Sequence, residues 1–267
     1  MTTAPTVGHR RPLTGLAKAE YLQFRRNKTL VFVGTVFPVG IPLLTFFAGR
    51  SDGDPMHTLV ATLEMFAIVA LLFVQYYSVL SMVTTRRGEG VLKRLRTGEA
   101  TDWQILTAPA VPGVLLTIAG AAIVTGFVYG TGAPVPVNPI AMVVALFGGL
   151  VVFSLLALAT SGVTKNAEAA QITALPVMAI AMVGMSSIRS VLPDRVAVLA
   201  DWTPFAAVSD LVSLGVTGTV ASAAESIPTM DINDTFVGFG VPLAVLAAWA
   251  VLALGLVYKT FRWDERG

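Results

Sequence analysis

Six long apolar runs constrain the fold of this sequence more than any other feature. A helix that crosses a bilayer needs about 20 predominantly apolar residues, because hydrocarbon offers no water to unpaired backbone groups. Only 13% of the residues are charged, against roughly 25% in an average soluble domain. The sequence therefore predicts an all-α integral membrane protein. Its predicted spans cover residues 29–49, 58–83, 107–130, 138–163, 169–189 and 236–258.

Lysine and arginine are distributed unequally between the polar segments that join these spans. Cytoplasmic segments of membrane proteins are enriched in both residue types. With six spans, the two termini share one side of the membrane with the 84–106 loop and the 164–168 turn. All but three of the 18 basic residues lie on that side, and the exceptions are Arg50, Arg189 and Arg195. We therefore predict a multi-pass protein with both termini in the cytoplasm.

The composition excludes several classes of function. The chain has no cysteine, which rules out disulfides and thiolate metal sites, and its two histidines, His9 and His57, lie far apart. A net charge of only +2 creates no field that would attract nucleic acid. The spans hold no cluster of polar residues at one depth, so we predict no catalytic residue and no metal site. The chain also lacks the G-x-x-x-x-G-K-S/T loop that cradles ATP phosphates, and we expect no ATPase site of its own.

The segment before the first span has an apolar face at helical spacing. That face is formed by Leu13, Leu16, Ala17, Tyr21 and Phe24, and the basic residues of the segment lie largely away from it. Such a pattern predicts an amphipathic helix that lies in the membrane interface. Two roles remain open for it. The helix either anchors the chain to anionic lipid or passes force from a soluble partner to the first span.

The loop after the second span is rich in glycine and basic residues. Gly88 and Gly90 are expected to end the preceding helix, and residues 91–96 to form a short helix of their own. Thr101 and Gln104 fit a capping box that opens the next helix. The short helix has an apolar side and a basic side, formed by Leu92, Leu95, Lys93, Arg94 and Arg96. It is either a docking surface for another protein or a positive charge that only sets the topology.

The stretch 190–235 is too apolar for a free loop and too interrupted for a span. Thr203 is expected to be a helix N-cap, Pro204 the first helical residue and Gly215 the C-cap. We predict one or two short helices that dip into the outer leaflet and return. The alternative is a helical lid on the outer surface.

These polar segments together resemble the ABC-2 family of ATP-binding-cassette permeases, especially the drug-exporter branch typified by the daunorubicin permease. The run Glu89-Gly90-Val91-Leu92-Lys93-Arg94-Leu95-Arg96-Thr97 is similar to the G-x-L-x-R-L-R-x-T loop that follows the second span in that family. Further similar stretches are Trp202-Thr203-Pro204-Phe205 with Asp210, and the ending Phe261-Arg262-Trp263-Asp264. The chain departs from the family pattern at Gly98-Glu99, where a proline often follows the loop.

The resemblance implies a type V exporter-like permease in a bacterial cell (inner) membrane. Its parts are an N-terminal segment, 1–28, with the interfacial helix, a six-helix domain, 29–258, with re-entrant helices in 190–235, and a cytoplasmic tail, 259–267. The resemblance also implies a dimer of identical or different permeases. Each permease is docked on a cytoplasmic ATPase subunit that binds ATP and Mg, so this chain binds no cofactor directly. The implied ATPase contacts are Glu89, Gly90, Leu92, Arg94, Leu95 and Arg96, with Lys165 and Glu168 as a weaker second contact.

We expect the chain to move a hydrophobic drug, antibiotic or lipid-like substrate out of the cell at the dimer interface. Gln75, Tyr76 and Tyr77 are candidates to line the substrate pathway, and packing between helices is the alternative role for all three. Glu64, the one acidic residue within a predicted span, is either functional or hydrated near the outer interface. Two other functions remain open. One is an ion-coupled secondary transporter, which normally needs ionisable residues or broken helices at mid-membrane. The other is an ABC-2 exporter of a polymer or glycolipid.

Overall fold

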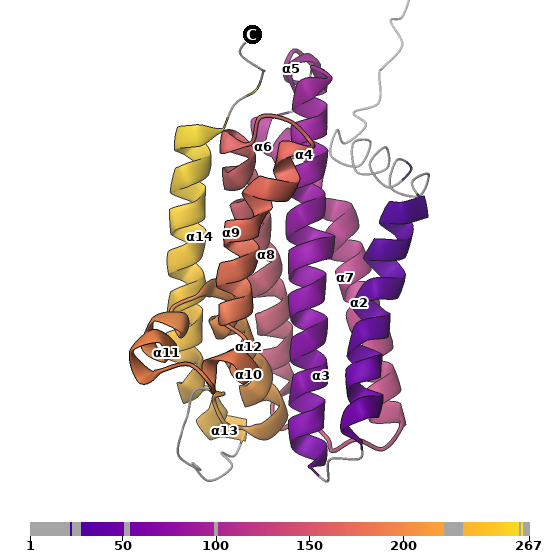
Figure 1. Cartoon of the computed structure of the whole chain (residues 1–267), viewed down its shortest axis with the longest axis vertical. Coiled ribbons are helices and arrows are strands. Elements are labelled where there is room, and N and C mark those ends of the chain that lie inside the picture. The colour runs from indigo at the N-terminus through magenta and orange to yellow at the C-terminus, as the bar shows by residue number, and fades with distance from the viewer. Residues whose placement is uncertain are drawn as a thin grey trace, which may run out of the picture.

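The computed structural model describes residues 22, 28–50, 54–98, 101–221, 232–261 and 263, and the described residues form helices without any strand. The long helices stand side by side in one bundle (Figure 1). One end of the bundle carries α5 (Val91–Arg96) and α6 (Asp102–Thr107), and we call it the α5 end. The opposite end carries α10 (Ser186–Arg189), α11 (Asp194–Ala200) and α13 (Ile232–Thr235), and we call it the α13 end.

Four helices in the described part of the chain are long and apolar enough to cross a membrane. They are Pro55–Gly88, α7 (Ala110–Gly130), α8 (Pro139–Val163) and Val237–Thr260, which comprises η2 (Val237–Phe239) and α14 (Gly240–Thr260). A fifth span results if α11 and α12 (Pro204–Thr217), which meet at an angle of 87°, are counted as one. The four correspond to the predicted second, third, fourth and sixth spans. An all-helical, multi-pass membrane protein is therefore confirmed, whereas the number six remains a prediction.

The predicted first and fifth spans coincide with shorter apolar helices. The apolar part of α2 (Lys28–Gly49) covers Gly34–Gly49, and α9 covers Ala169–Val183. The predicted end of the fifth span at residue 189 is wrong, because α9 stops at Val183 and α10 begins separately. Gly184 follows α9 where the chain meets the start of α12. A Cβ atom at Gly184 would lie 2.6 Å from the backbone nitrogen of Ala206.

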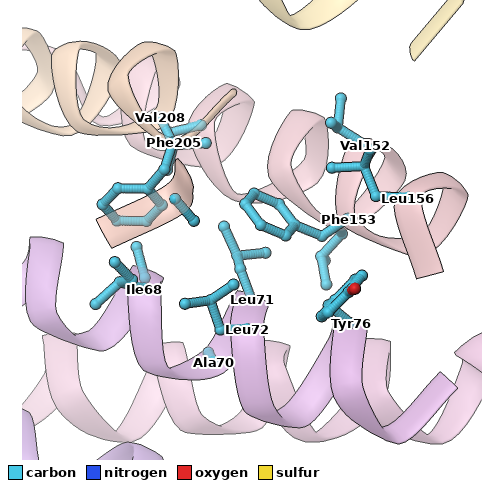
Figure 2. Packing of buried hydrophobic residues seen from close by; sticks show 14 of the residues in the cluster. Ile68, Ala70, Leu71, Leu72, Tyr76, Val152, Phe153, Leu156, Phe205 and Val208 are labelled. Atoms are coloured by element: carbon cyan, nitrogen blue, oxygen red, sulfur yellow. The ribbon is translucent and has the colours of Figure 1, made fainter. Parts of the chain in front are cut away.

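The helix Pro55–Gly88, called the long helix below, runs through the centre of the bundle. It consists of α3 (Pro55–Val69), the π-helical η1 (Ala70–Tyr77) and α4 (Ser78–Gly88) without a break. Leu71 and Tyr76 of η1 point toward Phe153 of α8, and Ile68 points toward Phe205 of α12 (Figure 2). Because lipid tails are as apolar as these side chains, close van der Waals packing rather than burial from water holds the contact together.

The helix α12 is buried along almost its whole length. Thr203 accepts a hydrogen bond from the Ala206 amide at 3.2 Å, and Pro204 opens the helix, as predicted. The predicted C-cap at Gly215 is wrong, because α12 continues to Thr217 and its C-cap is Gly218, which has a φ of 78°. Gly215 instead allows close packing on α8, since a Cβ atom there would lie 2.5 Å from Cγ of Met142. Because α12 is buried, the alternative in which the whole stretch 190–235 forms a lid on the outer surface does not fit the structure.

Candidate functional site

The predicted short helix after the long helix is present as α5. Gly90, with a φ of 68°, turns the chain between Gly88 and α5, in a left-handed conformation that other residues rarely adopt. Leu92 is only 1% exposed, and the half-buried Leu95 packs against the hydrophobic core. Lys93, Arg94 and Arg96 are exposed. The apolar side of α5 therefore faces the bundle, and its basic side faces outward.

Two contacts of Arg96 hold α5 against its neighbours. The Arg96 guanidinium pairs with Asp102 of α6, with 3.2 Å between Nε and Oδ1. The same guanidinium lies 4.7 Å from the ring centroid of Trp263, a distance typical of a cation–π interaction. The predicted capping box of α6 is also confirmed. Thr101 Oγ1 accepts from the Gln104 amide at 3.4 Å, and Gln104 Oε1 accepts from the Thr101 amide at 3.0 Å.

Arg87 fastens the last turn of the long helix to the end of α8. It is buried, and its guanidinium donates to the carbonyl of Ser161 at 2.7 Å and to the carbonyl of Thr164. A cation is favourable at a helix C-terminus, where carbonyls have no partner within the helix. This role of Arg87 was not predicted from the sequence. Nothing local distinguishes Arg87 from its neighbour Arg86, since the first acceptor lies 74 residues further along the chain.

The 164–168 turn follows α8 at the same end of the bundle, where the Thr164 carbonyl accepts from Arg87. The Thr164 side chain is buried and shares a hydrogen bond of 2.8 Å with Thr173. Lys165 and Glu168, the predicted second contact, are exposed. The turn therefore lies beside the C-terminal end of the long helix, directly before α5.

The residues proposed to line a substrate pathway form contacts between helices. Gln75 and Tyr76 are fully buried. Gln75 Nε2 donates to Ser154 Oγ at 2.7 Å, and the Tyr76 hydroxyl donates to Thr160 Oγ1 at 3.2 Å. Both bonds join the long helix to α8. Tyr77 is half-buried and packs against the hydrophobic core. Interhelical packing therefore accounts for the described contacts of all three residues.

Glu64 is 2% exposed, so its side chain does not lie at a hydrated surface of this chain. Its carboxylate accepts from the Ser186 amide and from Ser209 Oγ, both at 2.6 Å, and from the Ser186 hydroxyl. These bonds join the long helix to α10 and α12. A buried carboxylate with three donors is well suited to a structural role.

Arg189 extends this group of buried polar side chains at the α13 end. Its guanidinium pairs with Asp201 at 2.7 Å and Asp210 at 2.6 Å, and donates to Ser209 Oγ at 3.2 Å. We call the whole group the Glu64 network, which consists of Glu64, Ser186, Arg189, Asp201, Ser209 and Asp210. Contacts among these residues were not predicted from the sequence. No spacing rule relates Glu64 to partners more than a hundred positions away.

The five residues that form the apolar face of the predicted interfacial helix lie outside the described part of the chain, namely Leu13, Leu16, Ala17, Tyr21 and Phe24. That helix therefore stays a prediction.

Comparison with known proteins identifies one family. Residues 51–259, well over half of the chain, match the family model described as ABC-2 family transporter protein. No curated protein matches the chain. The matched region contains α5, the Arg87 contact with α8 and the Glu64 network.

Proposed function

Because this chain belongs to the ABC-2 family of transporter proteins, we propose that it is the permease subunit of an ATP-binding-cassette exporter. A separate cytoplasmic subunit binds ATP with Mg and hydrolyses it, and a second permease, identical or different, completes the dimer. The cargo is a hydrophobic drug, antibiotic or lipid-like molecule that leaves the cell through the apolar bundle.

The observation that carries this proposal is the exposed basic face of α5 on a firmly held base. Lys93 and Arg94 are exposed, whereas Leu92 is buried and anchors the helix. Glu89 and Arg94 are the contacts we assign to the ATPase subunit. Gly90 permits the turn that aims α5 outward. In this proposal Leu95 and Arg96 contribute both to the contact with the ATPase subunit and to the attachment of α5 to the bundle.

The long helix supplies a route for motion between α5 and the membrane domain. It extends without a break from Pro55 to Gly88, where it meets the α5 turn. Arg87 ties the same point to α8 and to the turn that contains Lys165 and Glu168. A displacement of α5 by the ATPase therefore acts on two spans together, as in rigid-body switching between packed helices.

Ion-coupled transport is the main competing function, and the Glu64 network is the observation that bears on it. Buried ionisable residues in a membrane protein are often functional. In this chain, however, Glu64 already accepts from two serines, and Arg189 already pairs with two aspartates. The network also lies at the α13 end, opposite α5. We assign it a structural role and favour ATP-driven export.

The test is to co-express the permease with the ABC ATPase encoded beside its gene and to measure whether the two co-purify. We expect Arg94→Glu to abolish co-purification, because it reverses the charge of an exposed α5 residue. Arg195→Glu is the matched control, since Arg195 is exposed on α11 at the other end. It should leave co-purification at the wild-type level.

A second arm uses the double variant Leu95→Ala, Arg96→Ala, which should insert in the membrane but fail to stimulate ATP hydrolysis. Wild-type co-purification of Arg94→Glu together with wild-type stimulation in the double variant would show that α5 is not the docking surface.

A further inference from the structure

A polar pocket of about 250 Å³ lies at the α13 end, and the proposed function does not use it. Three segments form it, namely the end of α2, the start of α3 and the turn 131–134 that follows α7 (Figure 1). Its volume is below the roughly 300–1,000 Å³ of pockets that hold drug-sized ligands. Among the described residues that line it, Arg50 and Asp54 are the charged ones. The pocket therefore suits a small polar group rather than a whole hydrophobic molecule.

Arg50 provides an accessible cation in this pocket. Its side chain is exposed, and the guanidinium carbon lies 5.2 Å from the ring centroid of Phe46. The ion pairs of the described residues do not include Arg50. A guanidinium that lies over a ring keeps its N–H groups free at the edge, where they can bind two oxygens of a phosphate. Arg50 is therefore well placed to bind an anionic oxygen group.

Asp54 provides an anion of fixed orientation in the same pocket. Its Oδ1 atom caps α3, because it accepts from the amides of Met56 at 3.0 Å and His57 at 3.1 Å. Asp54 is exposed, so its carboxylate can also accept from a ligand. The hydroxyls of Thr58 and Thr131 donate to backbone carbonyls at 3.0 and 2.8 Å, and their oxygens keep lone pairs that can accept. This side of the pocket therefore suits a cation that carries N–H groups.

Arg50 and Asp54 do not neutralise each other, since no ion pair joins these two described residues although both line the pocket. A ligand with a single charge is attracted by one of them and repelled by the other. A ligand with an anion and a cation a few bonds apart is attracted by both. Charge complementarity therefore selects a zwitterion for this pocket.

The pocket is continuous with an exposed aromatic surface. Phe46 lines the pocket, and its ring centroid lies 6.0 Å from that of Phe47 and 6.4 Å from that of Phe127. Phe47 is 51% exposed and Phe127 is 38% exposed, and both lie within one turn of the end of their helix. The ends of membrane-spanning helices lie near the interface, where phospholipid headgroups meet their acyl chains. A zwitterion held beside an apolar surface at this level is a lipid headgroup.

We propose that this pocket binds the headgroup of a phospholipid with a primary ammonium, such as phosphatidylethanolamine, from the leaflet at the α13 end. The lipid phosphate accepts from the Arg50 guanidinium, and the ammonium donates to the Asp54 carboxylate. The acyl chains lie over Phe47 and Phe127. The inference depends on membrane insertion alone, and not on an ATPase partner or a cargo.

The test uses the purified permease without any ATPase, delipidated in detergent and measured by native mass spectrometry. The probes are the palmitoyl-oleoyl forms of phosphatidylethanolamine, phosphatidylglycerol and phosphatidylcholine at equal concentration. All three carry the phosphate, but phosphatidylglycerol lacks a cation, and the quaternary ammonium of phosphatidylcholine has no N–H group. The wild-type protein should retain phosphatidylethanolamine about three- to tenfold more than either other lipid, because only its ammonium can donate a charge-assisted hydrogen bond to Asp54.

Two variants separate the two contacts. Asp54→Asn removes the charge but keeps the cap of α3, because asparagine caps helices as well as aspartate does. This variant should lose the preference for phosphatidylethanolamine over phosphatidylglycerol. Arg50→Gln should lower the retention of all three lipids, because each carries the phosphate. Arg195→Gln is the matched control, since Arg195 is exposed on α11 at the same end and does not line the pocket, and it should keep the wild-type pattern.

A soluble competitor distinguishes a lipid from a water-soluble ligand. Glycerophosphoethanolamine has the same two charged groups without acyl chains. An excess of it should leave most of the lipid bound, because it cannot cover the apolar surface of Phe47 and Phe127. Displacement of the lipid by this competitor would assign the pocket to a soluble zwitterion instead.

Two further results would overturn the proposal. One is equal retention of phosphatidylethanolamine and phosphatidylglycerol by the wild-type protein. The other is the wild-type pattern of retention in Asp54→Asn or in Arg50→Gln, which would place the bound lipid elsewhere. If Arg50→Gln does not fold, Asp54→Asn still decides the question, because that change preserves both the shape of the side chain and the cap.

Discussion

At the scale of single residues, buried polar side chains join helices that are distant in the sequence. Arg189 is the clearest case, because its guanidinium pairs with Asp201 and Asp210 and bonds Ser209, which in turn donates to Glu64. Both Arg189 and Asp210 are buried. When one partner of such a pair is removed, the other is left as an uncompensated charge in a medium of low dielectric constant.

We therefore predict that Arg189→Met lowers the free energy of unfolding by about 3–5 kcal/mol. The measurement is thermal unfolding of the purified protein in detergent, followed by tryptophan fluorescence. Arg195→Met is the control, because Arg195 is exposed on α11, and its melting temperature should stay close to that of the wild type. An equal melting temperature for both variants would argue against a structural role for the Glu64 network.

Gly215 is a second residue whose role depends on its neighbour in space. A Cβ atom there would lie 2.5 Å from Cγ of Met142 and 3.0 Å from the carbonyl oxygen of Asn138. Gly215→Ala should therefore destabilise the protein, although alanine is the better helix former by about 1 kcal/mol. Gly255→Ala in α14 is the matched control, since a Cβ atom there would meet no other helix of the described structure within 4 Å. Melting temperatures should fall for the first variant and stay level or rise for the second.

At the scale of elements, local sequence determines where the helices at the α5 end begin and end. Gly90 provides the left-handed turn before α5, and Thr101 and Gln104 cap α6 reciprocally. These features act within a few residues, so the sequence was sufficient to predict α5 and the N-terminal cap of α6. Attachment of α5 to the bundle is a different matter, because it also depends on residues far along the chain. These are Ser161, which accepts from Arg87 beside α5, and Trp263, which lies against Arg96.

The capping box leads to a prediction for α6. Thr101→Ala removes the side-chain acceptor for the Gln104 amide, a change that typically costs about 1 kcal/mol. Hydrogen exchange of the first amides of α6 should become about fivefold faster for that reason. Thr101→Ser keeps the hydroxyl and should exchange at the wild-type rate. Unchanged exchange in the alanine variant would mean that tertiary packing, and not the cap, holds this turn.

At the scale of the whole molecule, the two ends of the bundle differ in chemistry. The α5 end exposes Lys93, Arg94, Arg96 and Lys165, whereas at the α13 end Arg189 is buried in an ion pair with Asp210. Positive residues are retained on the cytoplasmic side. We therefore expect the α5 end to lie in the cytoplasm and the α13 end to lie outside.

This orientation can be measured directly, because the chain has no cysteine of its own. Thr97→Cys and Val191→Cys each place one exposed thiol at opposite ends, and Val191 is 80% exposed. A membrane-impermeant maleimide added to intact cells should label the residue 191 variant only. After permeabilisation both variants should react. Labelling of the residue 97 variant in intact cells would reverse the predicted topology.

The sequence by itself determined the membrane class, the four helices that are long enough to span, the α5 helix and the N-terminal caps of α6 and α12. Each of these follows from composition or from residues close together in the chain, because lipid requires long apolar helices and caps act over one turn. The end of α9 and the end of α12 were predicted wrongly. At both places a glycine, Gly184 or Gly215, packs closely against another helix. The spacing of residues along the chain cannot predict such a contact.

Only the tertiary structure decided which polar residues meet. Arg87 finds its acceptors on α8, Glu64 finds its donors on α10 and α12, and Gly215 admits α8. An apolar crevice of about 400 Å³ is likewise lined by residues from four helices, α3, α7, α8 and α12. Such contacts depend on how the helices are placed against each other, and in lipid every apolar helix face is equally acceptable to the solvent. Shape and hydrogen bonding between distant segments therefore select the arrangement that hydropathy leaves open.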